Sequence, residues 1–173
     1  MSPVAIVDLQ LATAGEELPE QAELEAWVNA VLVRFPQETR HEVTVRIVDC
    51  EEGQGLNRDY RGRDKPTNVL SFPFDGPPGL TLPLLGDLVL CHPVVVAEAR
   101  EQAKRLLDHY AHLVIHGMLH LLGHDHLEEA EAERMEALER EILADFAIAD
   151  PYAPLPGDHE QQDDAWTRDA IDE

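Results

Sequence analysis

The spacing of apolar residues predicts alternating strands and helices in the first half of the chain. Residues 4–10 form a largely apolar run, which is typical of a buried strand. Residues 19–35 carry apolar side chains at the i, i+3, i+4 and i+7 spacing of an amphipathic helix, which Pro36 would end. The same reasoning predicts a half-buried strand over residues 43–47, a short helix over 51–60, and strands over 67–72 and 86–91.

The second half of the chain is predicted to be mainly helical. Residues 73–83 hold four prolines and two glycines, so we expect a loop there. Pro93 suits a first helical turn, and a helical region is expected from there to about Leu122. Residues 127–148 have the pattern of a charged amphipathic helix, whose apolar side chains should pack while its glutamates face solvent.

A change in composition divides the chain into a domain and a tail. Its 173 residues suffice for one domain, and a hydrophobic content of 44% is typical of a globular protein. We therefore expect residues 1–149 to form a single folded domain. Residues 150–173 contain eight acidic side chains and three prolines, with Arg168 as their one basic residue, which predicts a disordered tail.

The formal charge of −22, from 35 acidic and 13 basic residues, restricts the possible partners. It opposes binding to bulk nucleic acid and to anionic membrane surfaces. The first 20 residues lack the features of a secretory signal, and no apolar run is long enough to cross a membrane. Cys50 and Cys91 have no metal-type spacing and are expected to be reduced thiols. These features predict a cytoplasmic protein with no membrane partner.

The chemistry of the chain is concentrated between His116 and His126. In a helix, His116 and His120 lie one turn apart on the same face, where two imidazoles can bind one Zn²⁺ at ~2.0–2.1 Å. Gly123 then allows the helix to end and the chain to turn back toward the metal. A third histidine would leave one coordination position open, as in catalytic zinc sites. Spacing alone does not decide whether His124 or His126 is that third ligand.

Other residues near this stretch have more than one interpretation. His109 and His112 continue the row of His116 along the helix, but they lie too far along its axis to share a metal with His120. We expect them on ordinary helix surface, with a role in lining a cleft as the alternative. Asp125 would suit an acceptor that orients a ligand imidazole.

The spacing H-x₃-H-x₂-G-x₂-H is also that of the metzincin proteases, with one difference. Those proteases have a glutamate directly after the first histidine, where it acts as general base. Gly117 occupies that position here. A zinc peptidase without this base would be a poor one, so the sequence favours another hydrolytic reaction.

The motif HGxLHLxGxDH, matched throughout from His116 to His126, resembles the signature of the YbeY-type endoribonucleases, which are bacterial rRNA maturation factors. Two further stretches agree with it. One runs from Leu56 to Pro73 and includes KPTNVLSFP, and the other is Gly86-Asp87-Leu88. The resemblance spans residues 43–148 and leaves the acidic tail outside.

The resemblance implies an α+β, zincin-like fold, in which a mixed sheet of about four strands packs with helices and the zinc-binding helix is central. It implies one Zn²⁺ per chain, bound by His116, His120 and His126, and so favours His126 over His124. It also implies single-strand-specific cleavage of RNA, maturation of the 16S rRNA 3′ end and ribosome quality control. The implied partners are single-stranded rRNA precursor and the ribosome or its small subunit, and no DNA partner is expected.

An arginine that is important for activity in that family matches Arg61. This residue lies in the window 57–65, where four basic side chains stand against two acidic ones. A guanidinium can stabilise charge that develops on phosphoryl oxygens, so Arg61 is the expected catalytic residue. No general base is evident, so hydroxide supplied by the metal or a substrate 2′-hydroxyl would have to serve. Thr67 and Asn68 are expected to fix this loop or to line the cleft, with turn-forming roles as an equal alternative.

Two functions of other classes stay open. One is a zinc peptidase-like metallohydrolase, against which Gly117 argues. The other is a non-catalytic ribosome-assembly factor whose zinc only orders the end of the helix. A fourth protein ligand on the zinc would support the second of these, because structural zinc sites are closed.

Overall fold

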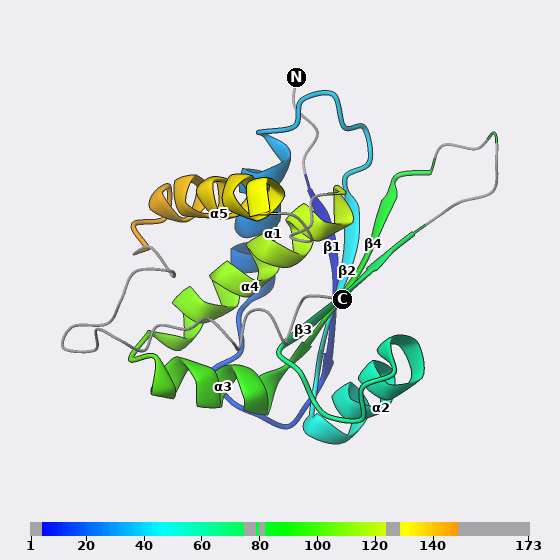
Figure 1. Cartoon of the computed structure of the whole chain (residues 1–173), viewed down its shortest axis with the longest axis vertical. Coiled ribbons are helices and arrows are strands. Elements are labelled where there is room, and N and C mark those ends of the chain that lie inside the picture. The colour runs from blue at the N-terminus through cyan, green and yellow to red at the C-terminus, as the bar shows by residue number, and fades with distance from the viewer. Residues whose placement is uncertain (1–4, 75–78, 80–81, 124–128, 149–173) are drawn as a thin grey trace.

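The computed structural model describes residues 5–74, 79, 82–123 and 129–148. Within these residues the chain forms an α+β fold of four strands and five helices (Figure 1). The fold class predicted from the sequence is confirmed. The elements in chain order are β1 (Ile6–Ala12), α1 (Gln21–Leu32), β2 (Glu42–Val48), α2 (Cys50–Arg61), β3 (Val69–Pro73), β4 (Leu84–Cys91), α3 (His92–Glu101), α4 (Leu106–Leu121) and α5 (Glu129–Ala144).

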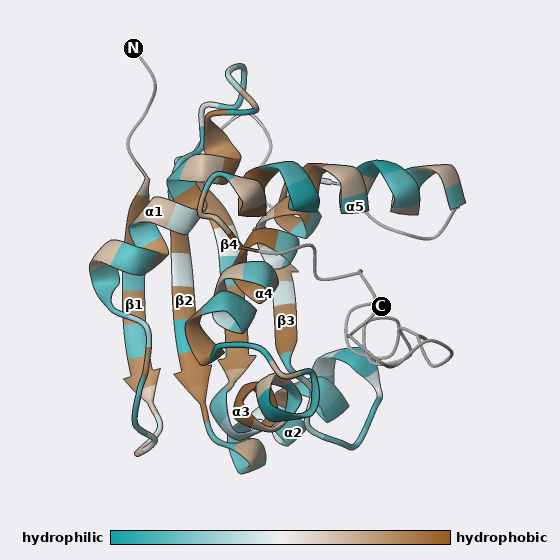
Figure 2. Cartoon of the chain, turned by 90° about the vertical axis from the view of Figure 1, so that its left-hand side faces the viewer, coloured by the Kyte–Doolittle hydropathy of each residue, from teal (hydrophilic) through white to brown (hydrophobic). Residues whose placement is uncertain are grey.

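The strands form one mixed sheet in the order β1-β2-β4-β3. Strands β1, β2 and β4 run parallel, whereas β3 pairs antiparallel with β4 and forms an edge of the sheet. Helices α1, α4 and α5 lie on one side of the sheet and α2 lies on the other (Figures 1 and 2). Helix α4 packs against β3, β4, α1, α3 and α5, so it is the central helix of the fold.

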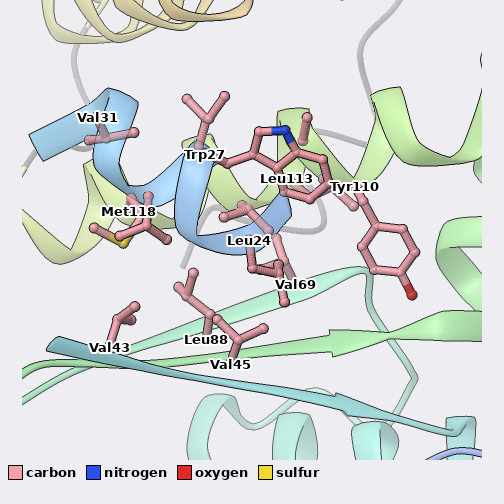
Figure 3. Packing of buried hydrophobic residues seen from close by; sticks show 14 of the residues in the cluster. Leu24, Trp27, Val31, Val43, Val45, Val69, Leu88, Tyr110, Leu113 and Met118 are labelled. Carbon is pink, nitrogen blue, oxygen red and sulfur yellow. The ribbon is translucent and has the colours of Figure 1, made fainter. Parts of the chain in front are cut away.

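The main hydrophobic core lies between the sheet and helices α1 and α4. Val43, Val45 and Ile47 of β2 are all buried, as their period of two predicts. Figure 3 shows Val43 and Val45 facing side chains of α1 and α4, among them Leu24 and Met118. A smaller cluster on the other face of the sheet consists of Val48, Leu70, Val89 and Cys91.

Helix α4 approaches the sheet most closely at Gly117. A Cβ atom at this position would lie 2.8 Å from Cδ2 of Leu88 and 3.2 Å from Oγ of Ser71. The hydroxyl of Ser71 donates a hydrogen bond of 3.4 Å to the Gly117 carbonyl. A side chain at position 117 would therefore displace Leu88 or Ser71, or push the helix away from the sheet, and glycine permits the observed packing.

The predicted helical region from Pro93 to Leu122 is two helices, and the prediction of one continuous region is wrong. Helix α3 ends at Glu101 and α4 begins at Leu106. Between them Ala103 has a φ of 56°, and the amide of Lys104 donates to the Ala99 carbonyl at 2.9 Å. A left-handed conformation costs an alanine about 1–2 kcal/mol and is usually marked by glycine or asparagine. No such residue is present here, so the sequence holds no local signal for this break.

Helix α5 confirms one part of its prediction and contradicts another. Met135 and Ile142 pack into the core as expected. Glu139, expected to face solvent with the other glutamates, is wholly buried at 0% exposure. The predicted tail over 150–173 and most of the loop over 73–83 lie outside the described residues. Among the helices of the described ranges, none combines the length and the apolar character that crossing a membrane requires.

Candidate metal centre

Helix α4 carries a row of four histidines, His109, His112, His116 and His120. The centroids of successive rings lie 6.1, 6.2 and 4.9 Å apart. The first three histidines are buried, and His120, near the helix end, is half-buried. The expectation that His109 and His112 lie on ordinary helix surface is therefore wrong. Carboxylates from α3 and α5 contact this face of α4, which makes it a polar part of the interior.

Glu98 of α3 contacts the first histidine of the row. Its Oε1 accepts hydrogen bonds from Nε2 of His109 at 2.9 Å and from Nδ2 of Asn68 at 3.0 Å. Burial lowers the pKa of His109, although the hydrogen bond to Glu98 opposes this effect. The Oδ1 atom of Asn68 accepts from the amide of Val69 at 2.6 Å. These contacts tie Asn68 to α3 and to the start of β3, a role that was not among those expected for it.

Glu139 of α5 lies between the next two histidines. Its Oε1 accepts a hydrogen bond from Nε2 of His112 at 3.0 Å, and its Oε2 accepts one from Nδ1 of His116. Burial lowers the pKa of His112 to about 4, so this ring is neutral at neutral pH. Burial alone would raise the pKa of Glu139, but the adjacent imidazoles outweigh it and hold the pKa below its ordinary range. The buried Glu139 side chain is therefore a carboxylate.

The sequence contains a signal for Glu139 that reasoning from the histidines missed. Met135, Leu138 and Ile142 form the apolar stripe of α5, and Glu139 falls on the same stripe. A charged residue on a buried stripe is expected to be paired. The signal is weak because α5 is rich in glutamates, and most of them are exposed or half-exposed.

His116 and His120, two of the predicted metal ligands, lie side by side on α4. Their rings lie one turn apart, with centroids 4.9 Å apart and planes inclined by 58°. Nδ1 of His116 is bound by Glu139, so Nε2 is the nitrogen that would bind a metal, and a carboxylate on the opposite ring nitrogen is usual for zinc ligands. Gly123 has a φ of 98° just beyond α4, in agreement with its predicted role at the helix end.

The predicted third ligand, His126, lies outside the described residues, as do its alternative His124 and the neighbouring Asp125. Within the described residues, the donor atoms of His112, His116 and Glu139 lie within 4.8 Å of one another and could together bind a metal ion. This grouping shares His116 with the predicted site. Imidazole and carboxylate donors suit zinc and other divalent first-row metals.

Arg61, the predicted catalytic residue, lies at the end of α2 across strand β3 from α4. Its Nη2 atom donates a hydrogen bond of 3.3 Å to the carbonyl of Ser71. Because Ser71 also contacts Gly117, a single residue of β3 links Arg61 to the turn of α4 that carries His116. The partner of Arg61 in this bond is a carbonyl, whereas Arg58 in the same helix forms ion pairs with carboxylates.

Fold and site together define a class of protein, a mixed α+β protein whose central helix carries a buried cluster of histidine and carboxylate groups suited to metal binding. The family model described as Endoribonuclease YbeY matches residues 10–147. The chain belongs to this family, which confirms the resemblance seen in its motifs.

Comparisons with individual proteins agree. A protein of Chromohalobacter salexigens named Endoribonuclease YbeY is 66% identical over 153 residues, covering 88% of this chain and 99% of that protein. A protein of the same name from Alteromonas mediterranea is 54% identical over 153 residues, covering 86% and 96%. The solution structure of TM1509 from Thermotoga maritima matches with a TM-score of 0.55 at 24% identity, over 89% of this chain and all of that one. That likeness shows that the fold is shared.

Proposed function

We propose that this chain is a zinc-dependent endoribonuclease that cleaves single-stranded RNA. Family membership and the relatives' shared name, Endoribonuclease YbeY, support the reaction class. The proposed substrate is the 3′ end of the 16S rRNA precursor on the ribosome or its small subunit in the cytoplasm. The proposed cellular role is maturation of this end and quality control of ribosomes.

One Zn²⁺ per chain would be bound by His116, His120 and His126. The chemistry of the donor set supports this, because two imidazoles one helical turn apart suit zinc and one of them has a carboxylate on its other nitrogen. When bound, zinc supplies Lewis acidity that activates water near neutral pH and stabilises charge on a phosphoryl oxygen.

Arg61 would bind the scissile phosphate from the other side of β3. Its guanidinium can donate two parallel hydrogen bonds to phosphoryl oxygens and can stabilise the charge that develops on them. Its position in the basic window also matters because the chain has a net charge of −22 and its overall field repels RNA. Local cationic groups must therefore provide the attraction.

The alternative of a zinc peptidase is disfavoured by the environment of position 117. The metzincin base would occupy this position, but a Cβ atom there would lie 2.8 Å from Leu88 and within the interface of α4 with the sheet. A glutamate there would displace the buried side chain of Leu88 or the helix, so this position disfavours the protease base. The observation that carries the proposal is the pair of neighbouring rings of His116 and His120. Arg61 lies across β3 from this pair, and position 117 disfavours the glutamate of a protease.

The proposal is tested by metal analysis of the purified protein together with cleavage assays on single-stranded and double-stranded RNA of the same sequence. We expect about one zinc per chain, and cleavage of the single strand that a chelator abolishes and zinc restores. A protein that binds zinc through four of its own residues and does not cleave RNA would instead be a ribosome-assembly factor with a structural zinc. Cleavage that is insensitive to chelators would contradict the metal dependence.

A further inference from the structure

The side chain of Glu139 links the core of α5 to the histidine row of α4. It is fully buried, and both of its oxygens are used, one for His112 and one for His116. We infer that Glu139 is a positioning residue for the metal ligand His116, and that His112 in turn positions Glu139. This inference rests on the proposed zinc site and extends it to two residues that do not bind the ion.

The contacts of Glu139 fix the tautomers of both histidines. A neutral imidazole carries one N–H, and a carboxylate can only accept a hydrogen bond. The contact of Glu139 with Nδ1 of His116 therefore places the proton on Nδ1 and the lone pair on Nε2, where a metal would bind. The contact with Nε2 of His112 requires the opposite tautomer in that ring. Two neighbouring histidines, one turn apart, are thus held in opposite tautomers by one carboxylate.

The packing around Glu139 supports the same role. Its side chain is fully buried, and Met135 and Ile142 of the same helix, which pack in the core, fix its position. A carboxylate that accepts from the far nitrogen of a ligand imidazole orients the ring and makes it a more basic ligand.

Glu98 and His109 provide a matched control on the same helix. They form a second pair of carboxylate and imidazole, 2.9 Å apart, in which the histidine is equally buried. This pair lies two turns from His116, so it has the same chemistry without contact with the proposed site. Glu98→Gln should therefore show the loss of folding stability that altering any such pair causes, and it should leave metal binding intact.

Zinc affinity, measured by competition with a chromophoric chelator, tests the inference. We expect Glu139→Gln to weaken zinc binding by about 10–100-fold, and Glu98→Gln to leave it within about threefold of the unsubstituted protein. His112→Ala should weaken it as well, whereas His112→Gln should restore most of the affinity because its amide nitrogen can replace Nε2 as donor to Glu139. Equal affinities for Glu139→Gln and Glu98→Gln would overturn the inference.

A direct role of Glu139 as ligand predicts a different pattern, since His112, His116 and Glu139 would then hold the metal. Zinc would survive His120→Ala and would be lost in His112→Gln, and this outcome also overturns the inference.

The tautomers can be measured in the unsubstituted protein, so the test does not depend on the folding of any variant. Long-range ¹H–¹⁵N correlation spectra of the zinc-free protein at pH 8 should show His116 protonated on Nδ1 and His112 on Nε2. His116 should keep its Nδ1 proton after zinc is added. Protonation of His116 on Nε2 in the zinc-free protein would overturn the inference. A protein that shows the expected tautomers but binds no zinc would contradict the proposed function and leave the orienting contact in place.

Discussion

Replacement of Arg61 by alanine separates a role in chemistry from a role in folding. In the structure the guanidinium makes a hydrogen bond of 3.3 Å to the Ser71 carbonyl from a half-buried position. Loss of one such bond is expected to lower the free energy of unfolding by about 1 kcal/mol. For a protein of this size that corresponds to a fall in Tm of about 2–4 °C. The variant should therefore fold and retain its zinc.

The expected effect on cleavage is much larger. Removal of one donor that stabilises developing charge lowers the rate by about 10²–10³-fold, or about 2.7–4 kcal/mol of transition-state stabilisation. Arg61→Lys should recover little of this, because an ammonium cannot replace the two parallel donors of the guanidinium. Arg58 in the same helix serves as control, since it is 56% exposed and pairs with Asp59 at 3.3 Å. Arg58→Ala should weaken RNA binding modestly and in a salt-dependent way.

The assay is single-turnover cleavage of a labelled single-stranded RNA over a range of RNA and salt concentrations. Arg61→Ala should remain slow at saturating RNA, whereas Arg58→Ala should recover the full rate there. If both variants lose activity equally and saturating RNA rescues both, the window 57–65 acts only through electrostatic docking. Arg61 would then have no part in the chemistry.

Three further predictions concern the metal and the stability of α4. His120→Ala should abolish zinc binding, and among the third-ligand candidates His126→Ala should abolish it while His124→Ala should not; metal analysis of the purified variants decides this. Gly117→Ala should lower the free energy of unfolding by up to about 2 kcal/mol, because overpacking costs about 1–3 kcal/mol and the better helix propensity of alanine returns about 1 kcal/mol; a higher Tm would contradict the close packing described above. The pKa of His109 is lowered by burial, so below pH ~6.5 the unfolded chain binds a proton that the folded chain does not. The free energy of unfolding should therefore decrease as the pH is lowered from 7 to 5, by up to ~1.4 kcal/mol per pH unit for this group. Urea titrations should show that the free energy of unfolding of His109→Gln depends less steeply on pH.

Much of the fold follows from local patterns in the sequence. The period of two over residues 43–47 and the helical spacing over 19–35 predict β2 and α1 because each has one buried face. The spacing of His116 and His120 likewise predicts that their rings are neighbours, because residues four apart lie on one face of a helix. These predictions depend on neighbours within one element, and such neighbours are fixed by backbone geometry alone.

What could not be predicted depends on contacts between elements. His109 and His112 fall outside the apolar stripe of their helix, so sequence reasoning placed them on the surface. Their burial becomes apparent only when Glu98 and Glu139, from two other helices, are brought to that face. The break between α3 and α4 is of the same kind, because Ala103 adopts a left-handed conformation that alanine by itself disfavours.

The position of carboxylates around α4 explains how a protease-like histidine spacing can accompany different chemistry. In metzincins the carboxylate follows the first ligand directly and acts on water. Here that position is Gly117, where a Cβ atom would lie 2.8 Å from Leu88 and 3.2 Å from Ser71 and would force these neighbours to shift. The carboxylate at this turn comes instead from Glu139 of α5 and contacts the ring of His116. In the proposed site, a carboxylate in that place would orient the ligand His116 and would lie on the side of the ring away from the metal. Without a protein base, hydroxide supplied by the metal would have to suffice as the nucleophile, or the 2′-hydroxyl of the RNA, which a peptide lacks, would take part as the nucleophile.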